Sequence, residues 1–595
     1  MHKLLKACVA VPIIISCACQ SHVIKTTDRD VYGLIEQRQT AALGATSDVR
    51  LPPEDGDVSL TERAYSFTPR PTEYELPDSF QVAPDSDHSE QDATPAETVD
   101  EMEDGGDEEV RDSIFSAEEQ DEVLIFGLRD ALAQAMRSGR DLQNAREDLY
   151  LAALDLTLER HLWTPQFVAG ATIDADYSDA GDLNDLERAI TTVGDVSLTQ
   201  RLPYGGQVTA RVIQTLVRDL EAHVTSGESG SLILEAEVPL LRGAGKVAYE
   251  SRYSAERAMI YAVRNFERFR RSYLVDVAAR YFDLQRTKAN IVNAYMSYAN
   301  SKADWERAEY TERVGRSKTV FDASRAKSSF RDAESDLVSA KESHATALDR
   351  FKIFLGMPVD TKLDVLDQDA DEQGRAVDKL LPDITVSEAV EVALQYRLDL
   401  LTEADRVDDS GRAVKIAKNR MLPDLAFAGG ITFPSDPERL NSTTFNTERN
   451  TWNAGLAFRI DDRKSERNGY RASLVALRRA QRDFEEFVDT VSADVRRAHR
   501  RIDEQVNLRL IQALNVDENE RRYEAARAQF DLGKIPNRDV VEADDDLLRA
   551  RNGLASAVAS YRNAILGFRL ATGTVRVKDD GTWETSNTQD PESGE

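Results

Sequence analysis

An internal duplication constrains the fold of this chain more than any other feature of its sequence. With an offset of 258 residues, residues 128–132 (LRDAL) align with residues 386–390 (VSEAV), and Pro165 aligns with Pro423. After each proline the sequence changes to an alternation of apolar and polar residues, which is typical of a half-buried strand. The duplication predicts that the chain contains two copies of one helix-and-strand unit.

Each copy also contains a run long enough for an unusually long helix. Residues 246–314 and 470–532 hold 69 and 63 consecutive positions without glycine or proline, and both runs are rich in helix-favouring residues. At 1.5 Å per residue, each run corresponds to a helix of roughly 100 Å. The shorter helical segments 316–355 and 387–422 together match one such length. We therefore expect one long helix to descend and two stacked helices to return, with coiled-coil packing.

The alternating segments predict strands of about ten residues. In residues 451–460, Trp452 and Phe458 share one face and Asn453 lies on the other. This pattern suits a transmembrane barrel with lipid outside and water inside, and it also suits a soluble sheet packed on a core. The first copy holds an extra strand pair near 203–230, which either joins the barrel or projects as a hairpin. The expected strands are 166–177, 192–202, 206–217 and 230–239 in the first copy, and 424–433 and 451–460 in the second.

The amino terminus predicts an export signal with a lipid attachment site. Two lysines precede a short apolar core that is too short to span a bilayer. The residues Ile14-Ile15-Ser16-Cys17 resemble the bacterial lipobox, so Cys17 is the candidate lipidation site and Cys19 is the alternative. Residue 18 is Ala and not Asp, which by resemblance to lipoprotein sorting favours the outer membrane. The competing interpretation is an ordinary signal peptide with a chance cysteine.

An acidic segment separates this signal from the duplicated part. Residues 85–122 hold 17 acidic residues and one basic residue, Arg111, which predicts a disordered, solvated linker. Before it, residues 31–42 form an amphipathic stretch with helical spacing. After it, no segment is apolar enough for a transmembrane helix, so any membrane-spanning region would have to be a closed barrel of strands.

Composition excludes several classes of function. The formal net charge of −31 disfavours a nucleic-acid partner. All three cysteines lie in the first 19 residues, so the rest of the chain has no thiol site or disulfide. Residues 240–247 lack the glycine and the hydroxyl of a phosphate-binding loop, and Asp544-Asp545-Asp546 would point in three directions on a helix. We therefore expect no enzyme activity, no cofactor and no metal site.

Taken together, these features resemble the TolC-type outer-membrane efflux proteins, in their outer-membrane lipoprotein subtype, over about residues 124–575. The resemblance also rests on residues 239–243 (PLLRG) after a strand and on residues 452–456 (WNAGL). It implies a mixed, mainly α fold, in which a trimeric α-helical barrel of long coiled-coil helices joins a transmembrane antiparallel β-barrel. Each protomer of this family is a tandem repeat of helix, strand, strand, long helix and returning helix.

The resemblance also implies a function and a set of partners. The chain would be the outer-membrane channel of a tripartite efflux or secretion system, passing small molecules from the periplasm to the exterior. Its partners would be two further copies in a homotrimer, a periplasmic adaptor, an inner-membrane pump and outer-membrane lipid. The competing class is a non-channel structural coiled-coil lipoprotein of the cell envelope. The implied segments are 1–16 (signal peptide), 17–122 (linker-containing segment), 123–383 (first repeat), 384–576 (second repeat) and 577–595 (polar tail).

Two glycines fall where this family turns its helices at the periplasmic tip. They are Gly315 in the first repeat and Gly533 in the second. Asp539 and Glu542 occupy the positions six and nine residues after Gly533, where the resemblance implies carboxylate rings at the pore entrance. The alternative is that both simply lie on a solvated helix face. The basic residue expected two positions after the glycine is Ile535 here, so the family's closing contacts do not transfer intact.

Overall fold

The computed structural model describes residues 20–44, 46–47, 49–50, 123–179, 186–219, 227–314, 321–367, 371–380, 384–435, 445–576 and 578. The chain divides into two units, residues 1–49 with 125–595 and residues 50–124. The elements described below, apart from Leu124, belong to the first unit. Cys17, Cys19, Gly315 and the acidic segment 85–122 lie outside the described residues.

Helices account for most of the described chain, and none of the helices in these ranges is long and apolar enough to cross a membrane. The expected amphipathic helix near residues 31–42 is present within α2. In chain order the helices are α2 (Gln20–Leu43), α5 (Leu128–Ser138), α6 (Arg140–His161), α7 (Glu250–Arg313), α8 (Asp322–Phe354), α9 (Glu372–Asp378), α10 (Val386–Tyr396), α11 (Leu398–Arg420), α12 (Lys464–Asp531) and α13 (Asn537–Ala571).

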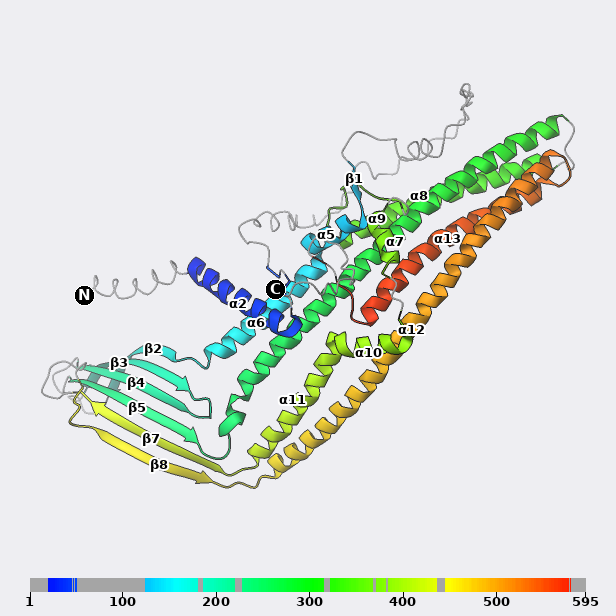
Figure 1. The fold of residues 1–595 in the computed structure, drawn as a ribbon. Coiled ribbons are helices and arrows are strands. Elements are labelled where there is room, and N and C mark those ends of the chain that lie inside the picture. Colours follow the sequence, from blue (N-terminus) through cyan, green and yellow to red (C-terminus); the bar gives the residue numbers. More distant parts are fainter. Residues whose placement is uncertain are drawn as a thin grey trace, which may run out of the picture. The chain divides into compact units, whose positions relative to one another are not determined.

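The two glycine-free runs form the two long helices that the sequence predicts. α7 has 64 residues and α12 has 68, so each is roughly 100 Å long. α7 begins after Gly245, which has φ +80°, and after one 3₁₀ turn over Gly245–Tyr249. α8 returns along α7, α11 packs on α12, and α13 lies against both α7 and α12 (Figure 1).

The six expected strands form one antiparallel sheet within the described residues. Their order is β2-β3-β4-β5-β7-β8, and Figure 1 shows them side by side. The extra pair, β3 and β4, is therefore part of the sheet and does not project from it. The strands are β2 (Gln166–Asp179), β3 (Leu186–Arg201), β4 (Gln207–Asp219), β5 (Gly227–Pro239), β7 (Asp424–Pro434) and β8 (Thr451–Arg459). A separate short sheet pairs β1 (Leu124–Phe126) with β6 (Leu363–Val365).

The duplication is visible in the element boundaries. α5, α6 and β2 begin at residues 128, 140 and 166, while α10, α11 and β7 begin at 386, 398 and 424. Each pair of starting points is separated by the offset of 258 residues that the sequence shows. Both copies thus build the same order of two helices followed by strands, and β3 and β4 are added only to the first copy.

The second copy differs from expectation at one point. The sequence predicts a single helix over residues 387–422, but the helix is broken at Arg397, where ψ is 117°. The Arg397 guanidinium holds the Asp399 carboxylate, with an Nη2–Oδ2 distance of 2.7 Å. In the first copy the equivalent break is at Gly139, where a Cβ atom would lie 2.0 Å from the Tyr273 hydroxyl.

The main core lies where α5, α6, α8 and α13 surround the middle of α7. Its largest fully buried side chains include Tyr281, Phe282 and Phe351. Arg562 of α13 lies over the Phe282 ring, 5.5 Å from its centroid. α2 is joined to this core through Val31 and Ile35, both of which are buried. Burial of these apolar side chains holds the two copies together around one core.

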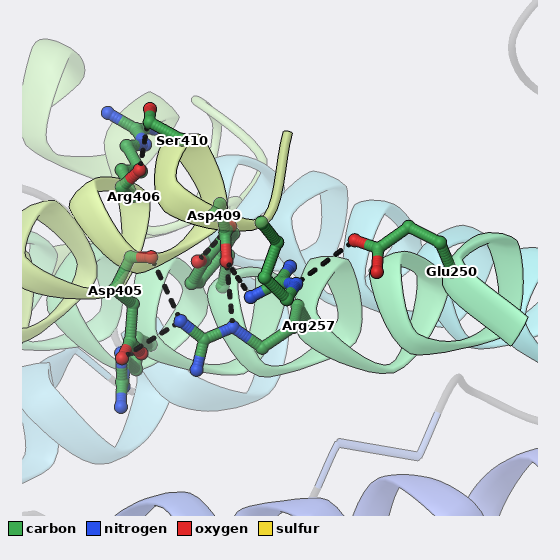
Figure 2. Close-up of polar contacts among 9 residues, drawn as sticks. Glu250, Arg257, Asp405, Arg406, Asp409 and Ser410 are labelled. Atoms are coloured by element: carbon green, nitrogen blue, oxygen red, sulfur yellow. Dashed lines mark hydrogen bonds and ion pairs between the residues drawn. The ribbon is translucent and has the colours of Figure 1, made fainter. Parts of the chain in front are cut away.

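A polar cluster joins α7 of the first copy to α11 of the second (Figure 2). Arg257 contacts two carboxylates, with Nη2 3.0 Å from Asp405 Oδ1 and Nε 3.2 Å from Asp409 Oδ1. Arg264 reaches Asp405 at 2.6 Å, and the Tyr261 hydroxyl donates to Asp409 at 2.5 Å. Burial and the adjacent Asp409 carboxylate raise the pKa of Tyr261 to about 12. The hydroxyl therefore stays protonated and donates throughout the physiological range.

Replacing Arg257 with methionine is expected to lower the free energy of unfolding by about 1–3 kcal/mol, because two part-buried carboxylates lose a shared cation. The matched control is Arg268→Met on the same helix. Arg268 is more than half exposed and makes one long contact of 3.5 Å with Asp399. Its loss should cost about 0–1 kcal/mol. Thermal unfolding of the detergent-extracted protein measures both, and equal losses would contradict the role given to the cluster.

Candidate functional site

The turn between α12 and α13 and the first turns of α13 contain three of the four residues that the sequence places at the helix tips. Gly533 follows the end of α12 with φ +68°, a left-handed conformation that glycine adopts without strain. Its N–H donates to the Phe530 carbonyl at 2.8 Å, and the Lys534 N–H donates to the Gln529 carbonyl at 2.9 Å. These two bonds form a Schellman motif, which ends the helix sharply. Gly533 thus ends α12, and its place at a periplasmic tip stays a prediction of the family resemblance.

Apolar contacts between α12 and α13 hold this turn in place. Tyr523 of α12 packs with Val540 and Leu547 of α13, and Phe530 and Ile535 lie against them. The position where the family resemblance implies a basic residue is thus taken by a side chain that packs into this cluster. The turn is stabilised by burial and not by a charge at residue 535.

Asp539, which is half-buried, and Glu542, which is exposed, lie on one face of the first turns of α13. They are three residues apart, which places them on neighbouring positions of a helix surface. Asp539 contacts Arg538 at 3.3 Å, and Glu542 lies 3.7 Å from Arg522 of α12. Asp546 continues the row one turn later and also binds Arg522. In a single chain this face is a row of carboxylates partly balanced by arginines. Among the described residues, no group of three or more His, Cys, Asp or Glu side chains is placed to hold a metal ion.

The two helix tips pack against each other. Ala308 of α7 and Ala326 of α8 are buried beside Trp305, and Phe530 of α12 contacts the same group. Phe321, at the start of α8, is largely exposed. Gly315 lies in the part of the chain outside the described residues, so the first tip is defined here only by the flanking ends of α7 and α8.

A pair of buried carboxylates lies deeper in the seam between α7 and α13, and sequence reasoning missed its importance. Asp544 accepts hydrogen bonds from Ser297 at 2.6 Å and from Asn300 at 2.9 Å. Asp304 is only 4% exposed and lies 3.5 Å from both the Tyr523 hydroxyl and Arg307. Burial raises the pKa of Asp304 to about 6, against the opposing effect of Arg307, and burial also raises the pKa of Asp544.

A signal for these residues is present in the sequence. The buried positions of lower α7 recur at spacings of three and four, and Asp304 occupies one of them, among residues otherwise small: Ala294, Ser297, Ser301, Asp304 and Ala308. A carboxylate in such a row faces the neighbouring helix and not water. The three adjacent acids of α13 do point in different directions, because Asp544 faces α7 while Asp546 faces Arg522 of α12.

Stability of this seam is expected to fall as pH rises from about 4 to about 6. Since the pKa of Asp304 is higher in the folded protein than its ordinary value of 3.8, the folded state binds the proton more tightly. The stabilisation is therefore complete at low pH and is lost as Asp304 ionises. Asp304→Asn should remove this slope and raise the free energy of unfolding at pH 7 by about 1–3 kcal/mol. The control Asp283→Asn changes an exposed carboxylate of the same helix, and pH-dependent thermal unfolding that is identical in both variants would contradict the prediction.

Comparison with known proteins finds a family match for part of the chain and relatives for more of it. Residues 389–574 match the family described as outer membrane efflux protein. The outer membrane protein TolC of Vibrio cholerae serotype O1 is 24% identical over 332 residues, which are 55% of this chain and 73% of that protein. The chain is thus similar to the outer membrane efflux protein family. Nodulation protein T of Rhizobium leguminosarum bv. trifolii is 25% identical over 189 residues, or 31% of this chain and 38% of that protein.

The fold is also that of solved outer membrane channels. The crystal structure of the Campylobacter jejuni CmeC outer membrane channel is similar with a TM-score of 0.56 and 16% identity, over 83% of this chain and 96% of that one. This likeness confirms the expected fold class, mainly helical with one β region. The family match confirms the expected family and, with it, a role in outer-membrane efflux.

Proposed function

We propose that this outer membrane efflux protein is the channel component of a tripartite efflux or secretion system and conducts small molecules passively from the periplasm to the exterior. Three copies would close one β-barrel through the outer membrane and one α-helical barrel across the periplasm. The observation that carries the proposal is a sheet with two open edges and two chemically different faces.

The faces of the sheet suit lipid on one side and water on the other. On β8, Trp452, Leu456 and Phe458 share one face, and Trp452 is 74% exposed. Asn453 lies on the opposite face. A contiguous apolar surface of this kind is rarely left exposed in water. Closing the sheet into a barrel would place the apolar face in lipid with every backbone group paired.

The two edge strands of the sheet, β2 and β8, explain why several copies would form a ring. Among the described residues, no strand pairs with the outer side of β2 or β8. The helices next to these edge strands also carry exposed apolar side chains. They are Leu151 and Leu158 on α6, which precedes β2, and Val475 on α12, which follows β8. Pairing β8 of one copy with β2 of the next would remove both edges and bury these side chains. The number of copies in this ring, three, is taken from the family resemblance.

The helix tips would form the periplasmic entrance. In a trimer, Asp539 and Glu542 would be repeated three times around the axis, giving carboxylate rings that attract cations and narrow the mouth. The tips, around residues 311–322 and 529–542, would receive a periplasmic adaptor linked to an inner-membrane pump.

The amino-terminal segment would attach the protein to the membrane. We propose that residues 1–16 are removed and that Cys17, or Cys19 in its place, carries the lipid. α2 follows these positions and is joined to the body of the protein, because Asp28 accepts a 2.5 Å hydrogen bond from Tyr150 of α6. The repeats would then occupy 123–383 and 384–576, between a linker-containing segment at 17–122 and a polar tail at 577–595.

Planar-bilayer recording tests the channel and its entrance together. The purified protein should form pores that prefer cations, and the double variant Asp539→Asn, Glu542→Gln should lose much of that preference, seen as a shift in reversal potential under a salt gradient. The control Asp517→Asn removes an exposed carboxylate from α12 away from the turn. An equal shift in the control would contradict the entrance assignment. A monomeric protein without conductance would instead favour a structural coiled-coil lipoprotein of the cell envelope.

A further inference from the structure

Two strands of the sheet have no counterpart in the second copy. β3 and β4 are inserted between β2 and β5, and the structure pairs them on both sides. β2 pairs with β3 from Gln166↔Thr199 to Asp179↔Leu186, and β4 pairs with β5 from Gln207↔Glu237 to Val217↔Gly227. The inserted strands are therefore central members of the sheet, as fully paired as the strands common to both copies.

The strand register aligns apolar residues of β3 and β4 with apolar residues of the neighbouring strands on one face of the sheet. Residues that are directly opposite each other in an antiparallel pair lie on the same face. One cross-strand row, followed from β2 to β8, is apolar at every position: Phe167, Leu198, Ala210, Leu234, Ile431 and Trp452. A second row, from β2 to β7, is apolar as well: Ala169, Val196, Val212, Leu232 and Phe433.

The opposite face is largely polar across the same strands. A row on that face consists of Gln166, Thr199, Thr209, Glu235, Gly430 and Asn453. A hairpin that projected into water would have no reason to keep its apolar residues in line with those of its neighbours. A one-residue slip of register would have exchanged the two faces, so the alignment is specific.

We propose that β3 and β4 form part of the lipid-facing wall, so that three copies close a barrel of eighteen strands. The proposal rests on the trimeric channel described above. The occupant of the apolar face of β3 and β4 is the hydrocarbon of the bilayer, because this face is continuous with that of the other four strands. The inserted strands have 16 and 13 residues, more than the 9–11 or so that a tilted strand needs to span a bilayer.

The turn between β3 and β4 lies at the same end of the sheet as the junction between β5 and α7. Gly205 and Gly206 have φ of +104° and +89°, and the Leu202 N–H donates to the Gly206 carbonyl at 3.0 Å. The Gly245 N–H donates to the Tyr204 carbonyl at 2.8 Å, which joins this turn to the segment that opens α7. The pair is thus fixed at the junction between sheet and helices.

The consequence is a wider passage through the outer membrane. Barrel diameter grows roughly in proportion to strand number, so eighteen strands give a diameter about one and a half times that of twelve, the number expected from two strands per repeat. Barrels of 16–18 strands enclose an aqueous channel. Cargo width would then be limited at the helical tip, and not within the membrane.

Single-cysteine labelling tests the placement of the inserted strands. The native cysteines all lie in the first 19 residues, so an environment-sensitive thiol probe at a new position can be compared with the unsubstituted protein as background. The labelled variants are Val196→Cys and Val212→Cys on the apolar face, and Ser197→Cys and Thr215→Cys on the other. Leu456→Cys on β8 is the reference for a strand common to both copies.

In lipid vesicles, a quencher attached to lipid chains is expected to reduce fluorescence at residues 196 and 212 as much as at residue 456. A water-soluble quencher should act on residues 197 and 215. Water-soluble quenching at residues 196 and 212, with lipid quenching kept at residue 456, would overturn the eighteen-stranded wall and leave the channel intact. Loss of lipid quenching at residue 456 as well would instead contradict the proposed membrane channel itself.

Discussion

A Gly206→Ala substitution is expected to destabilise the folded protein by about 2–5 kcal/mol, because it adds backbone strain and a clash at the same position. Gly206 has φ +89°, and a Cβ atom there would lie 2.1 Å from the Glu237 carbonyl oxygen and 2.8 Å from the Val238 Cα atom. Both obstacles are backbone atoms of β5, which cannot move without disturbing the sheet. The measurement is thermal unfolding of the extracted protein, together with the fraction that reaches the membrane in folded form.

The matched control for this prediction is Gly194→Ala in β3. Gly194 has no atom within 4 Å of the added Cβ position, and its φ lies outside the strained range. Its substitution should change stability by about 0.5 kcal/mol or less. If Gly206→Ala were as stable as Gly194→Ala, the close packing of the β3–β4 turn against β5 would be wrong.

Replacing Phe282 with alanine is expected to cost about 3–5 kcal/mol, since it leaves a cavity in the main core. The Phe282 side chain is fully buried and lies beneath Arg562 of α13, so its removal weakens contacts between the two copies. Phe269→Ala on the same helix is the control, because Phe269 is 36% exposed and should cost about 1 kcal/mol or less. Denaturant or thermal unfolding compares the two, and similar losses would contradict the position of the core.

The parts of the fold that follow from local periodicity could be predicted from the sequence. α7 and α12 were predictable because no proline interrupts them and Gly469, near the start of α12, is the only glycine within them. The six strands were predictable because their side chains alternate with period two. The break between α10 and α11 was not, because it occurs at Arg397, where no glycine or proline marks it. There the side chain of Asp399 holds the turn, and such a pairing depends on contacts that a propensity argument does not include.

The order of the strands and the role of the buried carboxylates could be established only from the three-dimensional structure. Alternation identifies a strand and its faces, but the partner of β3 is set by register with β2 and β4. Similarly, Asp539 and Glu542 lie in the first turns of α13, and their place at a pore entrance stays a prediction of the family resemblance. The importance of Asp304 was missed because charged residues on long helices usually face water. Its place in a row of small residues at spacings of three and four indicates burial, and the structure shows it 4% exposed.

The native mass of the detergent-extracted, mature protein tests the central claim most directly. The full chain has a mass of 66.4 kDa, and mass measurement in mild detergent separates one copy from three. The trimeric channel predicts three copies, because the open edges of β2 and β8 and the apolar side chains beside them are covered only in a ring. A stable monomer, with both sheet edges free in the same detergent, would contradict it.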